Sequence, residues 1–292
     1  MSRPDSQIPA NAFDTVESAD VRATDKAVIL AAGLGTRMRK DDASAELDAD
    51  QSAVADTGVK ALIPIKRPFL DYVLHTLADA GYRRVCLVIG PDHHEIRRYY
   101  EETIRPERLK ISFAIQASPR GTADAVACAE TFVAGDRFIV LNSDNFYPSM
   151  ACRALRYIRG SGLAVFDRDS MLRGSNIPVD RVLKFAVAKV SRGGVLERII
   201  EKPDQATVDS LGSEVLLSMN CWMFTSNIFR ACRAIAPSAR GELEITDAVQ
   251  YAIDQLDERF QVVASCSPVL DLSTRADVIP VTERLRDMEV SL

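Results

Sequence analysis

The sequence predicts an α/β protein with a mixed, mainly parallel sheet sandwiched by helices. Short apolar runs alternate with segments of helical spacing, a pattern typical of repeated βαβ units and a parallel sheet. The first run, AVILAA at residues 27–32, is bounded by glycine and suits a strand buried on both faces. The chain has 292 residues, 47% of them hydrophobic, which is enough for one large core.

Further strands and helices follow in order through the first half. We expect helices at residues 68–81, 93–104 and 121–133, and strands at residues 83–90, 109–116 and 136–144. Gly81 is a natural C-cap for the first of these helices.

The second half changes character. Residues 184–203 are typical of two strands around a turn at Gly193 and Gly194, and residues 213–224 of another strand. Residues 226–235, 244–256 and 274–288 have the spacing of helices. We expect residues 26–292 to form a single domain.

Two segments fall outside the alternation. Residues 1–25 are polar and acidic with little periodicity, which predicts a flexible N-terminal tail. Residues 40–58 are acidic and rich in alanine, and a loop of this length inside a compact domain is usually functional or disordered. We interpret residues 40–58 as an insertion loop, with a short helix that acts as a lid as the alternative.

The composition excludes some classes of function. The formal net charge of −5 argues against a general nucleic-acid binder, which would show a basic patch. No stretch reaches the ~18 apolar residues of a membrane span. The N-terminus lacks the basic start and apolar core of a signal peptide. We therefore expect a cytoplasmic protein that binds neither nucleic acid nor membrane.

The sharpest local motif is GLGTR, Gly33 to Arg37, directly after the first strand. Glycines let the backbone approach a phosphate, and successive N–H groups in such a turn can form an anion nest. Arg37 adds a fixed fork for phosphate oxygens. The motif is neither a dinucleotide fingerprint, because Met38 replaces its third glycine, nor a Walker loop.

Charged residues stand at the ends of other apolar runs. Asp144 ends a buried strand between Asn142 and Asn145, where ligands of open α/β sheets bind and where a hard cation can be held. Taken alone it is equally an Asx turn. Lys60 taken alone is a solvated lysine, and Asp271 taken alone is a helix cap.

Together the motifs resemble a known family. AVILAAGLGTRMRK, KALIPI, QASPRGTADA, VLNSDN, IIEKP and VLDLST occur in the order seen in sugar-1-phosphate nucleotidyltransferases, the NDP-sugar pyrophosphorylases. The resemblance spans about residues 26 to 280. It implies the nucleotide-diphospho-sugar transferase fold, which is Rossmann-like, and an enzyme that condenses an NTP with a sugar-1-phosphate to give an NDP-sugar and pyrophosphate with Mg²⁺.

The resemblance also implies roles for individual residues. The nucleotide-binding set is Ala32, Gly33, Gly35, Thr36, Arg37, Gln116, Gly121 and Thr122. The substrate-binding set is Asn142, Glu201, Lys202 and Asn220, and the metal ligands are Asp144 and Asp271. Arg37, Lys60 and Lys202 would supply catalytic positive charge, because two anions must meet and positioning with charge neutralisation is the main task.

Departures from the family pattern leave the acceptor open. Val59 stands where relatives have proline, and Ala186 stands where they often have glycine beside the sugar. Trp222 is either a core residue or a ligand-stacking one. The alternatives are the same chemistry on a cyclitol phosphate or phosphocholine, and a non-catalytic regulatory protein on the same fold. The nucleobase and the oligomeric state are not readable, although homo-oligomers are common in the family.

Overall fold

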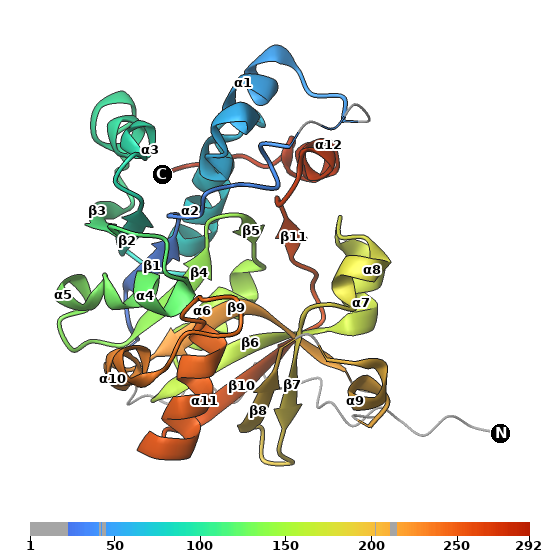
Figure 1. Cartoon of the computed structure of the whole chain (residues 1–292). Coiled ribbons are helices and arrows are strands. Elements are labelled where there is room, and N and C mark those ends of the chain that lie inside the picture. Colours follow the sequence, from blue (N-terminus) through green and yellow to red (C-terminus); the bar gives the residue numbers. More distant parts are fainter. Residues whose placement is uncertain (1–22, 41, 43–44, 202, 211–214) are drawn as a thin grey trace.

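Within the described part of the chain, a mixed sheet of nine strands forms the centre of the molecule (Figure 1). The computed structural model describes residues 23–292 except 41, 43–44, 202 and 211–214. The order across the sheet is β3-β2-β1-β4-β9-β6-β10, with β7 paired to β9 and β8 to β7. The strands are β1 (Lys26–Leu30), β2 (Arg84–Ile89), β3 (Lys110–Ile115), β4 (Phe138–Asn142), β6 (Ser161–Asp167), β7 (Ala186–Val190), β8 (Leu196–Ile200), β9 (Leu216–Phe224) and β10 (Phe260–Ser265).

Strand directions confirm the predicted fold class. The pairs β1–β2, β1–β4, β2–β3 and β6–β10 are parallel, whereas β9 runs antiparallel to β4, β6 and β7. The hairpin of β7 and β8 is antiparallel as well. The two strands expected around Gly193 and Gly194 are therefore confirmed.

Helices cover both faces of the sheet. They are α1 (Ala49–Thr57), α2 (Phe69–Asp79), α3 (His94–Arg98), α4 (Thr122–Ala127), α5 (Glu130–Val133), α6 (Ser149–Arg156), α7 (Arg168–Gly174), α8 (Val179–Val182), α9 (Gln205–Ser210), α10 (Asn227–Ala234), α11 (Ile245–Leu256) and α12 (Val278–Leu285). Short turns η1 (Lys60–Leu62) and η3 (Arg275–Asp277) are 3₁₀-helical, and η2 (Tyr99–Thr103) is a π-helix. The segment expected as one helix at 93–104 is thus α3 followed by η2.

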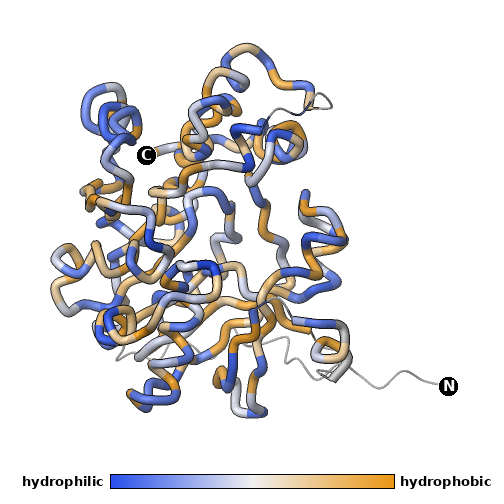
Figure 2. The backbone as a smooth tube through the Cα atoms, in the orientation of Figure 1, coloured by the Kyte–Doolittle hydropathy of each residue, from blue (hydrophilic) through white to orange (hydrophobic). Residues whose placement is uncertain are grey.

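The strand period of two explains why β1 is apolar throughout. Ile29 packs in a cluster with α2 and α6, whereas its neighbour Val28 packs in a second cluster with α4, α10 and α11. Successive side chains point to opposite faces, so a strand buried on both faces reads as a continuous apolar run. Figure 2 shows these central strands as hydrophobic and the outer helix α3 as hydrophilic.

The structure describes parts of both segments that fall outside the alternation. Residues 1–22 of the expected tail lie outside the described residues, but Thr24 hydrogen-bonds the carbonyl of Arg137 and Asp25 pairs with Arg84. Within 40–58, residues 49–57 form a short helix, as the alternative interpretation of this segment expected, and the role of a lid stays a prediction. A capping box between Asp48 and Gln51 starts this helix, and Gly58 ends it in the left-handed conformation.

Among the residues that the structure describes, every helix is too short or too polar to cross a bilayer.

The strand order reverses beside β1. The chain runs from β1 outward to β2 and β3, and then returns to place β4 on the other side of β1. Loops leaving the carboxyl ends of β1 and β4 therefore separate and open a crevice, which is where open α/β sheets bind ligands.

Candidate functional site

Two adjoining cavities occupy this crevice. Cavity A has a volume of about 420 Å³ and lies between the loop after β1 and the end of β4. Cavity B has a volume of about 540 Å³ and lies between β4, β9 and α8. Thr122, Asn142 and Asp144 line both cavities, so their contents would meet at these residues.

The glycine-rich loop forms one wall of cavity A. A Cβ on Gly35, which has a φ of 60°, would lie 2.0 Å from the carbonyl oxygen of Gly58, so only glycine fits. A Cβ on Gly33 would meet no heavy atom within 4 Å, which leaves room for a ligand at the backbone. Met38 is fully buried and anchors the end of the loop in the core.

Helix α1 supports this loop from outside. Arg39 Nε donates to the carbonyl of Thr57 at 2.9 Å. Arg275 on η3 donates to the carbonyl of Lys40 at 3.0 Å and forms an ion pair with Asp56. The segment expected as an insertion is thus fastened to the site at both ends.

The opposite wall of cavity A is the turn between β3 and α4. Gln116 is 5% exposed and its Nε2 donates to the carbonyl of Gly121 at 3.0 Å and to Asp124 at 2.8 Å. Gly121 has a φ of 114°, and a Cβ there would lie 2.5 Å from the carbonyl oxygen of Leu243. Thr122 Oγ1 accepts from the N–H of Ile245 at 2.9 Å, which ties this turn to the start of α11.

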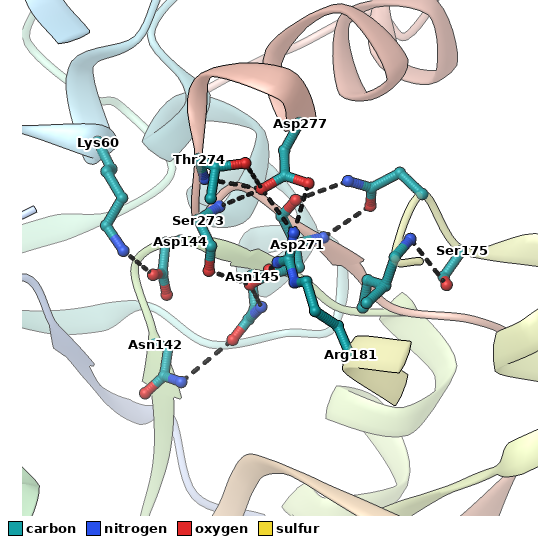
Figure 3. Close-up of polar contacts among 12 residues, drawn as sticks. Lys60, Asn142, Asp144, Asn145, Ser175, Arg181, Asp271, Ser273, Thr274 and Asp277 are labelled. Atoms are coloured by element: carbon teal, nitrogen blue, oxygen red, sulfur yellow. Dashed lines mark hydrogen bonds and ion pairs between the residues drawn. The ribbon is translucent and has the colours of Figure 1, made fainter. Parts of the chain in front are cut away.

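A second, two-stranded sheet brings the two aspartates together. In it β5 (Asn145–Phe146) pairs antiparallel with β11 (Leu270–Asp271), and Asp271 stands opposite Asn145. Asn145 Nδ2 donates to Asp271 Oδ1 at 2.8 Å, and the N–H of Leu272 donates to the carbonyl of Asp144 at 2.8 Å. Figure 3 shows the resulting cluster around Asp144 and Asp271.

Each carboxylate has a cation of the chain as partner. Lys60 pairs with Asp144, and Arg181 from α8 pairs with Asp271 (Figure 3). The pKa of Asp271 is raised to about 6, mainly by burial and next by the nearby charge of Asp144, whereas Arg181 acts in the opposite direction.

The two aspartates suit a hard divalent cation. Mg²⁺ is usually held by one or two carboxylates together with phosphate oxygens and water. Asp144 and Asp271 are close enough for the charge of one to act on the other, and both face the cavities. The described residues hold no cluster of three or more His, Cys, Asp or Glu fit for a metal, so these two carboxylates would need ligand oxygens to complete the shell.

Cavity B carries polar groups on its floor and mouth. Ser218 on β9 is 6% exposed, and its hydroxyl finds no hydrogen-bond partner among the described residues. Asn220, two positions along, has a φ of 56° and accepts a hydrogen bond from Trp222 Nε1 at 3.2 Å. Trp222 itself is fully buried, which confirms it as a core residue.

Glu201 stands at the mouth of cavity B. The residue is open to solvent, yet the protein around its carboxylate raises the pKa above the ordinary value of 4.5. Desolvation is the main cause and the charges of Glu244 and Asp247 add to it, whereas Thr246 and Arg240 act in the opposite direction.

Most of the site residues predicted from the sequence line one of the two cavities. Ala32, Gly33, Gly35, Thr36, Lys60, Gln116 and Gly121 line cavity A, and Arg37, Glu201, Asn220 and Asp271 line cavity B. Arg37 therefore faces cavity B, whereas the rest of its loop faces cavity A. Lys202 lies outside the described residues.

Sequence reasoning missed several lining residues of cavity B, among them Ser218, Arg240 and Arg181. Ser218 lies only two positions before Asn220 on β9, and both residues line the cavity. Arg240 precedes the GELEITD segment and pairs with Glu244. Arg181 carries no sequence signal, because it reaches the site from a short polar helix between two strands.

Comparisons with known proteins identify the family of the chain. The sequence profile described as nucleotidyl transferase matches residues 26–275. A glucose-1-phosphate thymidylyltransferase of Streptomyces griseus is 33% identical over 230 residues, which cover 78% of this chain and 57% of the relative. A UTP–glucose-1-phosphate uridylyltransferase of Haloferax volcanii is 26% identical over 230 residues, 78% of this chain and 83% of the relative.

Solved structures share the fold. A UDP-glucose pyrophosphorylase complexed with UDP-glucose matches with a TM-score of 0.69 at 19% identity, covering 91% of this chain and 100% of the other. The chain spans just over half the length of the thymidylyltransferase named above.

Proposed function

Because the chain belongs to the nucleotidyl transferase family, we propose that it transfers a nucleotidyl group from a nucleoside triphosphate to a sugar-1-phosphate. The products are an NDP-sugar and pyrophosphate. The observation that carries the proposal is the pair Asp144 and Asp271, which the β5–β11 sheet holds where two cavities join. One cavity has a glycine-rich wall suited to a triphosphate, and the other has hydroxyl and carboxylate groups suited to a polyhydroxylated acceptor.

The chemistry requires positioning and charge neutralisation. An oxygen of the acceptor phosphate attacks the α-phosphorus, the new P–O bond forms, and the bond to the β-phosphate breaks with its electron pair leaving on pyrophosphate. An ionised phosphate needs no general base. Mg²⁺ held by Asp144 and Asp271 would neutralise phosphate oxygens when bound.

The residues of the chain divide this work between the cavities. In cavity A, the backbone at Gly33 and Gly35 approaches the triphosphate and Lys60 neutralises it. Arg37 lines cavity B near the place where the two cavities join, and it stabilises the negative charge that develops there during the reaction. In cavity B, Glu201 and Asn220 bind acceptor hydroxyls and Arg240 binds the acceptor phosphate. We assign Lys202 to the acceptor phosphate as well, from the family resemblance alone.

A specific feature favours a second acceptor class. Ala186 on β7 is buried opposite Ser218, at the position where relatives often have glycine. A methyl group on one strand and a hydroxyl on the next change the shape and polarity of this part of the acceptor site. A cyclitol phosphate, which keeps the ring of hydroxyls, is therefore the second candidate.

The decisive experiment is a grid of nucleoside triphosphates against small phosphates, scored by pyrophosphate release with Mg²⁺. dTTP and UTP enter first, with glucose-1-phosphate, other sugar-1-phosphates, cyclitol phosphates and phosphocholine as acceptors. Asp144→Asn and Asp271→Asn should abolish release. Asp257→Asn is the matched control, because Asp257 lies at the C-cap of α11 with a φ of 51°, which asparagine tolerates. No release with any pair would instead favour a non-catalytic binding protein.

A further inference from the structure

The segment between β6 and β7, residues 168–185, forms a wall of cavity B. It carries the short helices α7 and α8, which lie beside β11 in Figure 1. From α8, the side chain of Arg181 reaches into the cluster of Figure 3. This wall contacts the site at one of the two carboxylates proposed for metal binding.

Arg181 is held firmly on one side. Its Nη1 donates to both carboxylate oxygens of Asp277, at 2.8 and 3.0 Å. Asp277 is only 3% exposed and also accepts from the N–H groups of Ser273 and Thr274, at 3.0 and 2.7 Å. One edge of the guanidinium is therefore fixed, and Nη2 is the part that faces the site.

Nη2 of Arg181 pairs with one particular oxygen of Asp271. The other oxygen, Oδ1, already accepts from Asn145 Nδ2 at 2.8 Å and from Ser273 Oγ at 3.1 Å. Arg181 Nη2 donates to the other oxygen of this carboxylate, Oδ2. A divalent cation that binds Asp271 at its less engaged oxygen would compete with Arg181 for that same atom.

The buried charge of Asp271 calls for a cation partner. The residue is 5% exposed and lies near Asp144, and a buried carboxylate beside another is costly without compensation. The guanidinium of Arg181 supplies this charge through its ion pair with Asp271.

We propose that Arg181 is a resident counter-cation of Asp271 that yields Oδ2 to the divalent metal ion and then presents Nη2 to the acceptor phosphate in cavity B. Asp277 keeps the guanidinium in place during this exchange. The second half of this inference, that Arg181 binds the acceptor phosphate, rests on the proposed function. Its first half, competition with the metal ion, requires no turnover.

The first test measures metal affinity without substrates. Mn²⁺ is titrated into the wild type and Arg181→Met at pH 8, and free Mn²⁺ is followed by electron paramagnetic resonance. Arg181→Met should bind Mn²⁺ about tenfold more tightly, because no ion pair must open and a nearby positive charge is gone. Arg181→Lys, which cannot bridge both aspartates, should fall between the two and serves if the methionine variant does not fold.

Arg284 offers a matched control. It is an exposed arginine of α12 whose Nη2 donates to the carbonyl of Ser175 at 3.2 Å, so it too joins α12 to the α7–α8 segment. It makes no contact with either metal-site aspartate in the structure. Arg284→Met should leave the Mn²⁺ affinity unchanged.

The second test uses turnover with Mg²⁺. Arg181→Met should raise the KM for the acceptor about 10- to 100-fold and leave the KM for the nucleotide nearly unchanged, as expected for loss of a charge-assisted hydrogen bond to phosphate. Folded variants with unchanged or weaker Mn²⁺ affinity would overturn the counter-cation role and leave Arg181 as a structural tether. An unchanged acceptor KM would overturn the acceptor role. An inactive wild type with tighter Mn²⁺ binding in Arg181→Met would refute the proposed function alone.

Discussion

Lys60 and Asp144 form an ion pair although 84 positions separate them in the chain. Their side chains are only 16% and 20% exposed, so water screens the pair less than it would at the surface. The pair links η1, which follows the inserted helix, to the loop that leaves β4. It places a cation on the wall of cavity A next to the carboxylate shared by both cavities.

Replacing Lys60 by methionine should lower kcat/KM about 10²- to 10³-fold, because one positioned charge is lost at the triphosphate. Steady-state pyrophosphate release measures this. Lys189→Met is the control, since Lys189 pairs with Glu197 on the exposed β7–β8 hairpin. Equal activity of Lys60→Met and Lys189→Met would show that Lys60 has no role in the reaction.

Alanine at two nearby glycines should have different effects. Gly35→Ala forces a side chain into a left-handed backbone, which costs about 1–2 kcal/mol, and drives its methyl group against Gly58. It should lower the Tm and raise the KM for the nucleotide. Gly33→Ala has free space, so it should keep the wild-type Tm and raise only the KM for the nucleotide. Thermal melts and steady-state kinetics of both variants distinguish the two effects. A lower Tm for Gly33→Ala would contradict this prediction.

Burial of Met38 should matter for both folding and nucleotide binding. Met38→Ala leaves a cavity beneath the glycine-rich loop and should lower the free energy of unfolding by about 2–5 kcal/mol. Met150 on α6 is 52% exposed, so Met150→Ala should change the unfolding free energy very little. Urea denaturation of both variants makes the comparison, and similar losses would show that the loop is not anchored through Met38.

Acceptor binding should depend on pH through Glu201. Its raised pKa means that the carboxylate takes up a proton at a higher pH than an ordinary glutamate does. The KM for the acceptor should therefore rise as pH falls through this pKa, and stay constant above it. Glu201→Gln should have a higher KM at neutral pH and lack this component of the profile.

The acceptor phosphate itself titrates near pH 6 and affects the KM of both enzymes equally. Comparing the pH profiles of the wild type and Glu201→Gln therefore separates the effect of Glu201 from that of the phosphate. Identical profile shapes for wild type and Glu201→Gln would exclude Glu201 as the titrating group.

Local patterns predicted the elements whose burial is strongest. β1 and β2 are apolar on both faces, and α2 and α11 have helical apolar spacing, so each was found from its own residues. The six motifs also gave the right family, which the profile match over residues 26–275 confirms. Helix α1 was predicted only as the alternative to a loop, because its apolar residues form no stripe and its ends are fixed by polar caps.

Local sequence patterns could not predict contacts between segments that lie far apart in the chain. The pairing of Asp271 with Asn145 joins strands of two residues each, too short for any periodic signal. Arg181 reaches Asp271 only because β6, β7 and β11 fold together, and no spacing along the chain indicates this. The resemblance supplied Asp144 and Asp271 as a pair, and the structure adds the sheet that holds them together.

The contact between Gly35 and Gly58 has a consequence for chain length. The two glycines close the base of the inserted segment, so the path between them can lengthen or shorten while Arg37 and Lys60 stay where they are. Loop length costs little entropy once its ends are fixed. Homologues that differ in this region can therefore share one geometry of the loop that we propose for phosphate binding. The exposed side of α1 is also a suitable place to graft an epitope or a fluorescent reporter.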